Sequence, residues 1–138
     1  MWIMVAGPYT SGGAGPALRA ANLDAMNRAA LALFDRGHVP IIGVNMALPV
    51  IAVAGPDQFD RLMMPISLAL AERCDACLRI GGASGGADDE VSRFRAAGKP
   101  VYFRLEDVPS DGSTASPTSA ANAASTTFSP IPQRNASS

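Results

Sequence analysis

The chain has 138 residues, of which 48% are hydrophobic, and its 11 basic and 12 acidic residues give a formal net charge of -1. This length is enough for one domain with its own core and too short for two. No run of Lys or Arg gathers positive charge, which argues against a nucleic-acid backbone or an anionic membrane as partner and favours a small-molecule ligand.

The chain begins with a short apolar run, Trp2 to Ala6, that stops at Gly7-Pro8. The run lacks a positively charged start and is too short for a signal peptide or a membrane span, so we expect a cytoplasmic protein. Its uninterrupted apolar character predicts a strand buried on both faces. A polar, glycine-rich loop from Tyr9 to Gly15 follows.

A long helix is predicted next, from Pro16 to a stop at Gly37. Apolar residues recur along it at three- and four-residue spacing: Leu23, Met26, Ala30, Leu33 and Phe34. After His38, Val39 to Val44 predicts a second buried strand. A strand, a helix and a strand with this spacing imply a parallel pair joined by a right-handed crossover.

The segment 45–57 is apolar, but prolines interrupt it and it has neither a helical nor a strand period. It is interpreted as a lid or an oligomer contact. The segment 59–73 is predicted to be helical, with Pro65 either kinking the helix or starting its second part.

The remaining pattern predicts a third strand over 76–80, a loop over 81–86, a helix over 87–97 and a fourth strand over 100–104. The architecture is therefore α/β. From about Ser110 the chain is rich in Ser, Ala, Thr and Pro, which predicts one folded domain over 1–108 and a disordered tail over 109–138. A domain this small needs a fifth strand or a partner subunit to cover its sheet edge.

Glu90 is the candidate reactive group. If Gly86 caps the last helix, its buried face holds Ala87, Val91 and Phe94, and Glu90 lies along the edge of that face. A carboxylate near a helix N-terminus, beside a glycine-rich loop, is placed to touch a substrate. The alternative interpretation is an acidic residue that only favours the helix dipole.

Ligands of such sheets bind at the carboxyl ends of the strands, where the two glycine-rich loops 7–15 and 81–86 lie. The first loop has neither the residues of a Walker A motif nor the spacing of a dinucleotide fingerprint. Both loops offer backbone N–H groups and hydroxyls to a sugar or phosphate: Tyr9, Thr10, Ser11 and Ser84. Arg79, just before the second loop, either meets a phosphate or is paired within the protein.

Cys74 and Cys77 form a C-x-x-C pair, but no second Cys or His cluster exists to complete a metal site. We therefore expect no metal and no organic cofactor.

Several motifs, taken together and in order, indicate a family. They are Val5-Ala6-Gly7-Pro8-Tyr9-Thr10, Gly37-His38-Val39-Pro40, Cys74-Asp75-Ala76, and Ser84-x-Gly86-x-x-x-Glu90 followed by Gly98-Lys99-Pro100-Val101. On these motifs, over about residues 2 to 104, the chain resembles the nucleoside 2-deoxyribosyltransferase-like superfamily. It is similar to that superfamily's small bacterial members and to the 2′-deoxynucleoside 5′-phosphate N-hydrolases.

The resemblance implies a flavodoxin/Rossmann-like three-layer sandwich with a parallel sheet of four to five strands. It also implies cleavage or exchange of the N-glycosidic bond of a nucleoside or its 5′-monophosphate, with Glu90 as the nucleophile. The binding residues it implies are Gly7, Pro8, Tyr9 and Thr10 in the first loop and Ser84, Gly85 and Gly86 in the second. Because relatives commonly dimerise, we expect a homodimer or a higher homo-oligomer.

Two positions depart from the family pattern: Met4 stands where a tyrosine is usual and Ser67 where an aspartate is usual. Tyr9 could replace the first group, and Asp57 or Asp60 the second. These departures keep open a nucleotide-binding protein of the same fold without catalysis. A phosphoribohydrolase of the cytokinin-activating kind is a third, lower-ranked alternative, since its P-G-G-x-G-T-x-x-E motif is not met.

Overall fold

The computed structural model describes residues 1–110. Its strands form one all-parallel sheet in the order β2-β1-β3-β4. The strands are β1 (Trp2–Ala6), β2 (Val39–Ile41), β3 (Ala76–Arg79) and β4 (Val101–Tyr102). The helices are α1 (Pro16–Asp35), α2 (Gly43–Ala54), α3 (Phe59–Arg73) and α4 (Gly85–Ala96), with the short 3-10 turns η1 (Pro56–Gln58) and η2 (Leu105–Asp107).

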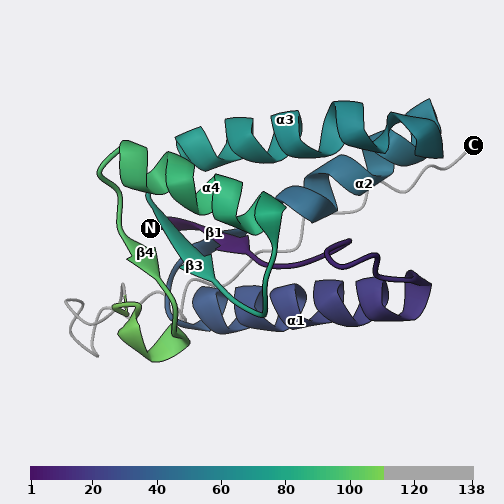
Figure 1. Ribbon diagram of the computed structural model, residues 1–138. Helices are drawn as coiled ribbons and strands as arrows, with labels where there is room; N and C mark the ends of the chain where they lie inside the picture. The colour runs from purple at the N-terminus through teal and green to yellow at the C-terminus, as the bar shows by residue number, and fades with distance from the viewer. Residues whose placement is uncertain (111–138) are drawn as a thin grey trace, which may run out of the picture.

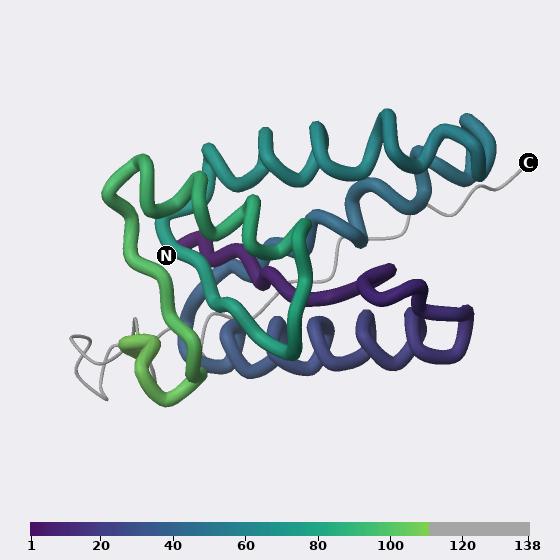
Figure 2. Tube along the Cα trace, viewed as in Figure 1, coloured from purple at the N-terminus to yellow at the C-terminus, as the bar shows by residue number. Residues whose placement is uncertain are grey.

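The sheet is the middle of three layers: α1 lies along one face, and α3 and α4 lie along the other (Figure 1). The Cα trace in Figure 2 shows the same arrangement, with α1 below the strands and α3 above them. The expected α/β sandwich with a parallel sheet of four strands is therefore confirmed.

Alternating side chains of the central strands supply both halves of the core. Ile3 and Val5 of β1 face α1, where they pack with Met26 and Leu33. Met4 and Ala6 face the other way and pack with residues of α3 and α4, including Phe94. Because both faces are covered, the strands have the continuous apolar sequence that predicted them.

The strand order reverses between β1 and β3. From β1 the chain crosses to β2 on one side, and from β3 it continues to β4 on the other side. The loops that follow β1 and β3 therefore diverge from the same edge of the sheet and leave a crevice between them.

The second strand and the segment after it differ from the prediction. The strand ends at Ile41 rather than Val44, and the segment interpreted as a lid or an oligomer contact is mostly helix α2. Tertiary packing explains the helix: a Cβ on Gly43 would lie 2.2 Å from Ser67 Oγ, so only glycine lets α2 approach α3 this closely. This packing outweighs the helix-breaking tendency of Pro49.

Helix α3 has the predicted bounds and is continuous through Pro65, so Pro65 does not start a second helix. Strand β4 is shorter than predicted and covers only Val101–Tyr102 of the expected 100–104. Within residues 1–110 the sheet has four strands, and the predicted tail falls almost entirely outside the residues described.

Within residues 1–110, β2 is one of the two edge strands of the sheet, and it contains a proline. The Val39 N–H donates to the Met1 carbonyl of the neighbouring β1 chain at 2.9 Å. Because successive residues of a strand point their backbone groups to opposite sides, the nitrogen of Pro40 faces the open edge. Pro40 therefore leaves the outer side of this short strand without a hydrogen-bond donor.

Helix α2 has an apolar outer side. It has no charged residue, and Met46, Val50 and Val53 are exposed on it, Val53 to 91%. A helix that is apolar all round is usually covered. The expected homodimer stays a prediction, and this side of α2 is where we would look for its contact.

Candidate functional site

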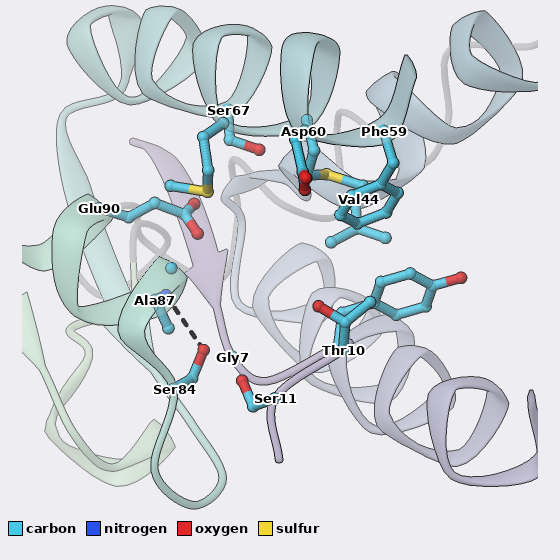
Figure 3. Close-up of a pocket in the computed structure, with 14 residues that line it drawn as sticks. Gly7, Thr10, Ser11, Val44, Phe59, Asp60, Ser67, Ser84, Ala87 and Glu90 are labelled. Atoms are coloured by element: carbon cyan, nitrogen blue, oxygen red, sulfur yellow. Dashed lines mark hydrogen bonds between the residues drawn. The ribbon is translucent and has the colours of Figure 1, made fainter. Parts of the chain in front are cut away.

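A cavity of about 220 Å³ lies at the carboxyl edge of the sheet, at the crevice between β1 and β3. Three parts of the chain build it: the loop after β1, the first turns of α4, and one side of α3 with the start of α2. Its lining consists of Gly7, Tyr9, Thr10, Ser11, Val44, Phe59, Asp60, Met63, Met64, Ser67, Ser84, Gly86, Ala87 and Glu90. In Figure 3, Glu90 reaches in from α4, while Ser67, Asp60 and Phe59 reach in from α3.

Most of the residues expected at a ligand line this cavity: Gly7, Tyr9, Thr10, Ser84, Gly86 and Glu90. Pro8 and Gly85 do not. Pro8 instead packs against the second loop, where a Cβ on Gly81 would lie 2.7 Å from Pro8 Cδ. Gly81 has a φ of +75°, so this contact between the two loops depends on glycine there.

Gly7 is required for a reason other than the expected approach of a ligand. A Cβ at this position would lie 3.1 Å from Ile80 Cγ1 and 3.3 Å from Met26 Cγ. Gly7 therefore lets the ends of β1 and β3 pack closely over α1. This packing fixes the floor of the crevice.

Ser84, not Gly86, caps helix α4. Its Oγ accepts a hydrogen bond from the Ala87 N–H at 3.2 Å, as an N-cap serine does. Gly86 lies inside the first turn, where a Cβ would lie 3.2 Å from Met64 Sδ. The cap and this close packing set the start of α4 and with it the position of Glu90.

Glu90 lies on the sheet side of α4 and is 8% exposed. Ala87, Val91 and Phe94 are buried beside it, as the helical spacing predicted. No side chain within residues 1–110 forms a hydrogen bond to its carboxylate. Its oxygens therefore face the cavity without a partner from this part of the chain.

Burial raises the pKa of Glu90 to about 7. The positive charge of Arg79 lowers this pKa, and the negative charge of Asp89 raises it further, but loss of solvation is the largest effect. A carboxyl group with such a pKa exchanges its proton near neutrality, which is a property of groups that act in catalysis.

Arg79 is paired within the protein. It is 9% exposed, and its guanidinium donates to the carbonyls of Ile80 and Gly82, the latter at 2.8 Å. It also lies 3.4 Å from the carboxylate of Asp88 in the first turn of α4. Of the two interpretations of Arg79, the structure supports the paired one, and Arg79 does not line the cavity.

On the side of the cavity formed by α3, sequence reasoning considered Asp60 and Ser67 but missed the other lining residues. Phe59, Asp60, Met63, Met64 and Ser67 all line it. Their spacing of three and four residues places them on one helical face, which is the signal that could have found them. Met63 also belongs to a buried cluster with Ala47 and Ile51, so it contributes to the core as well as to the cavity.

This chain departs from the family pattern at two positions, Met4 and Ser67, and only one of them lies at the cavity. Met4 is fully buried in the core beside α4, whereas Ser67 is buried but lines the cavity. Of the two aspartates considered as substitutes, Asp60 lines the cavity and Asp57 does not.

Two aromatic rings form the outer wall. The rings of Tyr9 and Phe59 are stacked, with centroids 6.4 Å apart and planes at 17°. A second hollow of about 430 Å³ continues on their other side and shares Thr10 and Asp60 with the first. Flat aromatic surfaces beside acidic and hydroxyl groups suit a ligand with both a planar ring and a sugar.

The cysteines are not reactive groups. Burial is the main cause that raises the pKa of Cys74 to about 11 and that of Cys77 to about 12, so both stay protonated thiols. Among the described residues, no three His, Cys, Asp or Glu side chains come together as metal ligands would.

No protein-family model matches the chain, and no curated protein shows significant similarity to it. The resemblance to the nucleoside 2-deoxyribosyltransferase-like superfamily therefore stays an interpretation of its motifs. In the part of the chain that the structure describes, no helix combines the length and apolar character needed to cross a bilayer.

Proposed function

We propose that this protein cleaves or exchanges the N-glycosidic bond of a nucleoside or its 5′-monophosphate, with Glu90 as the nucleophile. One observation carries the proposal. Glu90 is a buried carboxylate without a protein partner in residues 1–110, aimed into a cavity at the point where the strand order reverses.

In the proposed reaction, a carboxylate oxygen of Glu90 forms a bond to C1′ of the sugar while the bond from C1′ to the base nitrogen breaks. The base leaves with the electron pair of that bond and takes up a proton. Water, or a second base, then attacks C1′ and releases Glu90. An anion beside C1′ stabilises the positive charge that develops on the sugar.

The other lining groups support a sugar-bearing ligand. Thr10, Ser11 and Ser84 place hydroxyl groups along the lower wall, opposite Asp60 (Figure 3). Hydroxyls and a carboxylate are suitable hydrogen-bond partners for sugar hydroxyls. The stacked rings of Tyr9 and Phe59 offer a flat apolar surface to the base.

A second candidate is a nucleotide-binding protein without catalysis. The observation that favours it is Ser67, a neutral side chain that lines the cavity at the position of the family's aspartate. In such a protein the same cavity would hold the ligand, and Glu90 would bind a hydroxyl in place of attacking C1′.

The decisive experiment incubates the protein with deoxynucleosides and their 5′-monophosphates, with and without a second free base, and separates the products by chromatography. We expect base release by the native protein, rising as the pH increases through about 7 because attack needs ionised Glu90. Glu90→Gln should abolish the release.

The matched control is Glu72→Gln, because Glu72 is an exposed residue of α3 that pairs only with Arg93. It should leave base release unchanged. If no substrate releases its base and one of them stabilises the protein against heat, the second candidate, a nucleotide-binding protein without catalysis, is supported and the enzyme is not.

A further inference from the structure

Arg79 connects three segments that together position Glu90. It is the last residue of β3, it donates to two carbonyls of the loop that follows, and it reaches Asp88 in the first turn of α4. Asp88 precedes Glu90 by only two residues. A single buried guanidinium therefore joins the end of the strand, the loop and the start of the helix.

The contacts with the loop are specific to the forked shape of the guanidinium. One terminal nitrogen of Arg79 donates to the Ile80 carbonyl, and the other donates to the Gly82 carbonyl at 2.8 Å. These carbonyls belong to the tight turn in which Gly81 has a positive φ. A lysine has one nitrogen and cannot hold both carbonyls with the same geometry.

Arg79 also supplies positive charge near Glu90. It is the cation that lowers the pKa of Glu90, and its own neighbour Asp88 is 69% exposed, so water screens part of the opposing charge. The remaining titratable groups around Glu90 are acidic or neutral. They are Asp89 on α4, Cys77 on β3, Cys74 after α3, and Asp60 and Tyr9 at the cavity wall.

We propose that Arg79 is the positioning residue of this site: its guanidinium fixes the 80–84 loop and the start of α4, and through them the place of the Glu90 carboxylate. Arg79 acts through Glu90 and the loop, not by contact with the ligand. Two tests follow, and only the second, which measures base release, rests on the proposed function.

The first test is a titration of the Glu90 side-chain carboxyl by carbon NMR in the full-length protein, with Glu90→Gln used to assign its signal. Arg79→Met removes the charge at similar length and should move the titration of Glu90 upward by about one pH unit. Arg79→Lys keeps the charge and should leave the midpoint near that of the native protein. Asp88→Asn removes the counter-charge of Arg79 and should move the midpoint downward.

Arg93→Met is the matched control. Arg93 lies on α4, the helix that carries Glu90, and its half-exposed side chain pairs with Glu72. It should leave the titration of Glu90 in place. An unchanged midpoint in Arg79→Met, or an equal shift in Arg93→Met, would overturn the proposal. If Arg79→Met does not fold, the other two variants still test the electrostatic part: a clearly shifted midpoint in Arg79→Lys, or an unchanged midpoint in Asp88→Asn, would contradict it.

The second test measures base release against pH. In Arg79→Lys a single amino group replaces the guanidinium, so the loop loses one of the two hydrogen bonds that its carbonyls accept. We expect kcat to fall roughly tenfold to a hundredfold, while the pH at half-maximal rate stays unchanged. A native rate in this variant would overturn the positioning role. If the native protein releases no base, the proposed function fails, but the NMR titration still tests the role of Arg79.

Discussion

Helices α2 and α4 have the same length, 12 residues, and both border the cavity. α4 contains its own helix signals: Ser84 caps it, Asp88 lies in its first turn, and Arg93 and Arg95 lie in its last turn. α2 has no side-chain cap and no charge, and it includes Pro49. α4 therefore has local helix signals in addition to its packing against α3, whereas α2 is held by its packing on α3.

The two helices therefore differ in what holds them in place beside the cavity. The packing of α2 rests on Gly43 against Ser67 and on Ala47 and Ile51 near Met63. The local signals of α4 help to offset the free-energy cost of the buried carboxylate that it carries. The reactive group therefore lies on the helix that has its own N-cap.

The largest effect should come from removing that carboxylate. The pKa of Glu90 is about 7 in the folded protein against 4.5 for an ordinary glutamate, so the folded state holds the proton longer and its stability falls as the pH rises between these values. Glu90→Gln has no proton to lose. It should be more stable than the native protein by about 3 kcal/mol at about pH 8 and by under about 1 kcal/mol at about pH 5.

Urea unfolding of both proteins at the two pH values measures this difference. Glu72→Gln should show no such dependence, because Glu72 is exposed and paired on the surface. A pH-independent gap between Glu90→Gln and the native protein would show that burial does not raise the pKa of Glu90.

The next largest effect should come from the first residue of α2. Gly43 begins α2 as Gly85 begins α4, so the two glycines can be compared directly. An alanine Cβ at Gly43 would lie 2.2 Å from Ser67 Oγ and 3.1 Å from Ser67 Cα, whereas Gly85 has no atom within 4 Å of such a Cβ. Gly43→Ala should destabilise the protein by about 2 kcal/mol, despite the better helix propensity of alanine.

Gly85→Ala should leave stability unchanged or raise it by a few tenths of a kcal/mol, roughly the helix preference of alanine at such a position. Thermal and urea unfolding of both variants checks the pair. Equal effects in the two helices would contradict the conclusion that the first residue of α2, unlike that of α4, has to be glycine.

The smallest effect should come from the cap of α4. Ser84→Ala removes the bond to the Ala87 N–H and should lower the free energy of unfolding by about 1 kcal/mol. Ser84→Asp should retain the cap and most of the stability, which makes it the control. A loss much greater than this in Ser84→Ala would mean that α4 relies on more than its own signals.

The sequence predicted the elements whose signals are local. Periodic apolar residues identified α1 and α4, and continuous apolar runs identified the central strands. Helix α2 was missed because the reason for it, the fit of Gly43 against Ser67, joins positions far apart in the chain. The same distance explains why Asp60, Phe59 and Ser67 were not all expected at the site: their place there follows from how α3 crosses the sheet.

Some details of the site had local signals that went unused. Ser84 precedes the helix directly and is a better cap than the glycine at 86, which is what the hydrogen bond to Ala87 shows. The roles of Pro8 and Gly81 had no such signal, because their contact joins two loops that meet only in the folded sheet.

Pro40 limits how a second copy could pair with the sheet at β2. Adding a strand there would need backbone donors, and within residues 1–110 the outer side of β2 offers none, which disfavours growth of the sheet at this edge. A second copy that binds at the β2 edge would therefore do so through side chains and not through a shared sheet. The apolar residues Met46, Val50 and Val53 of α2 provide such a surface.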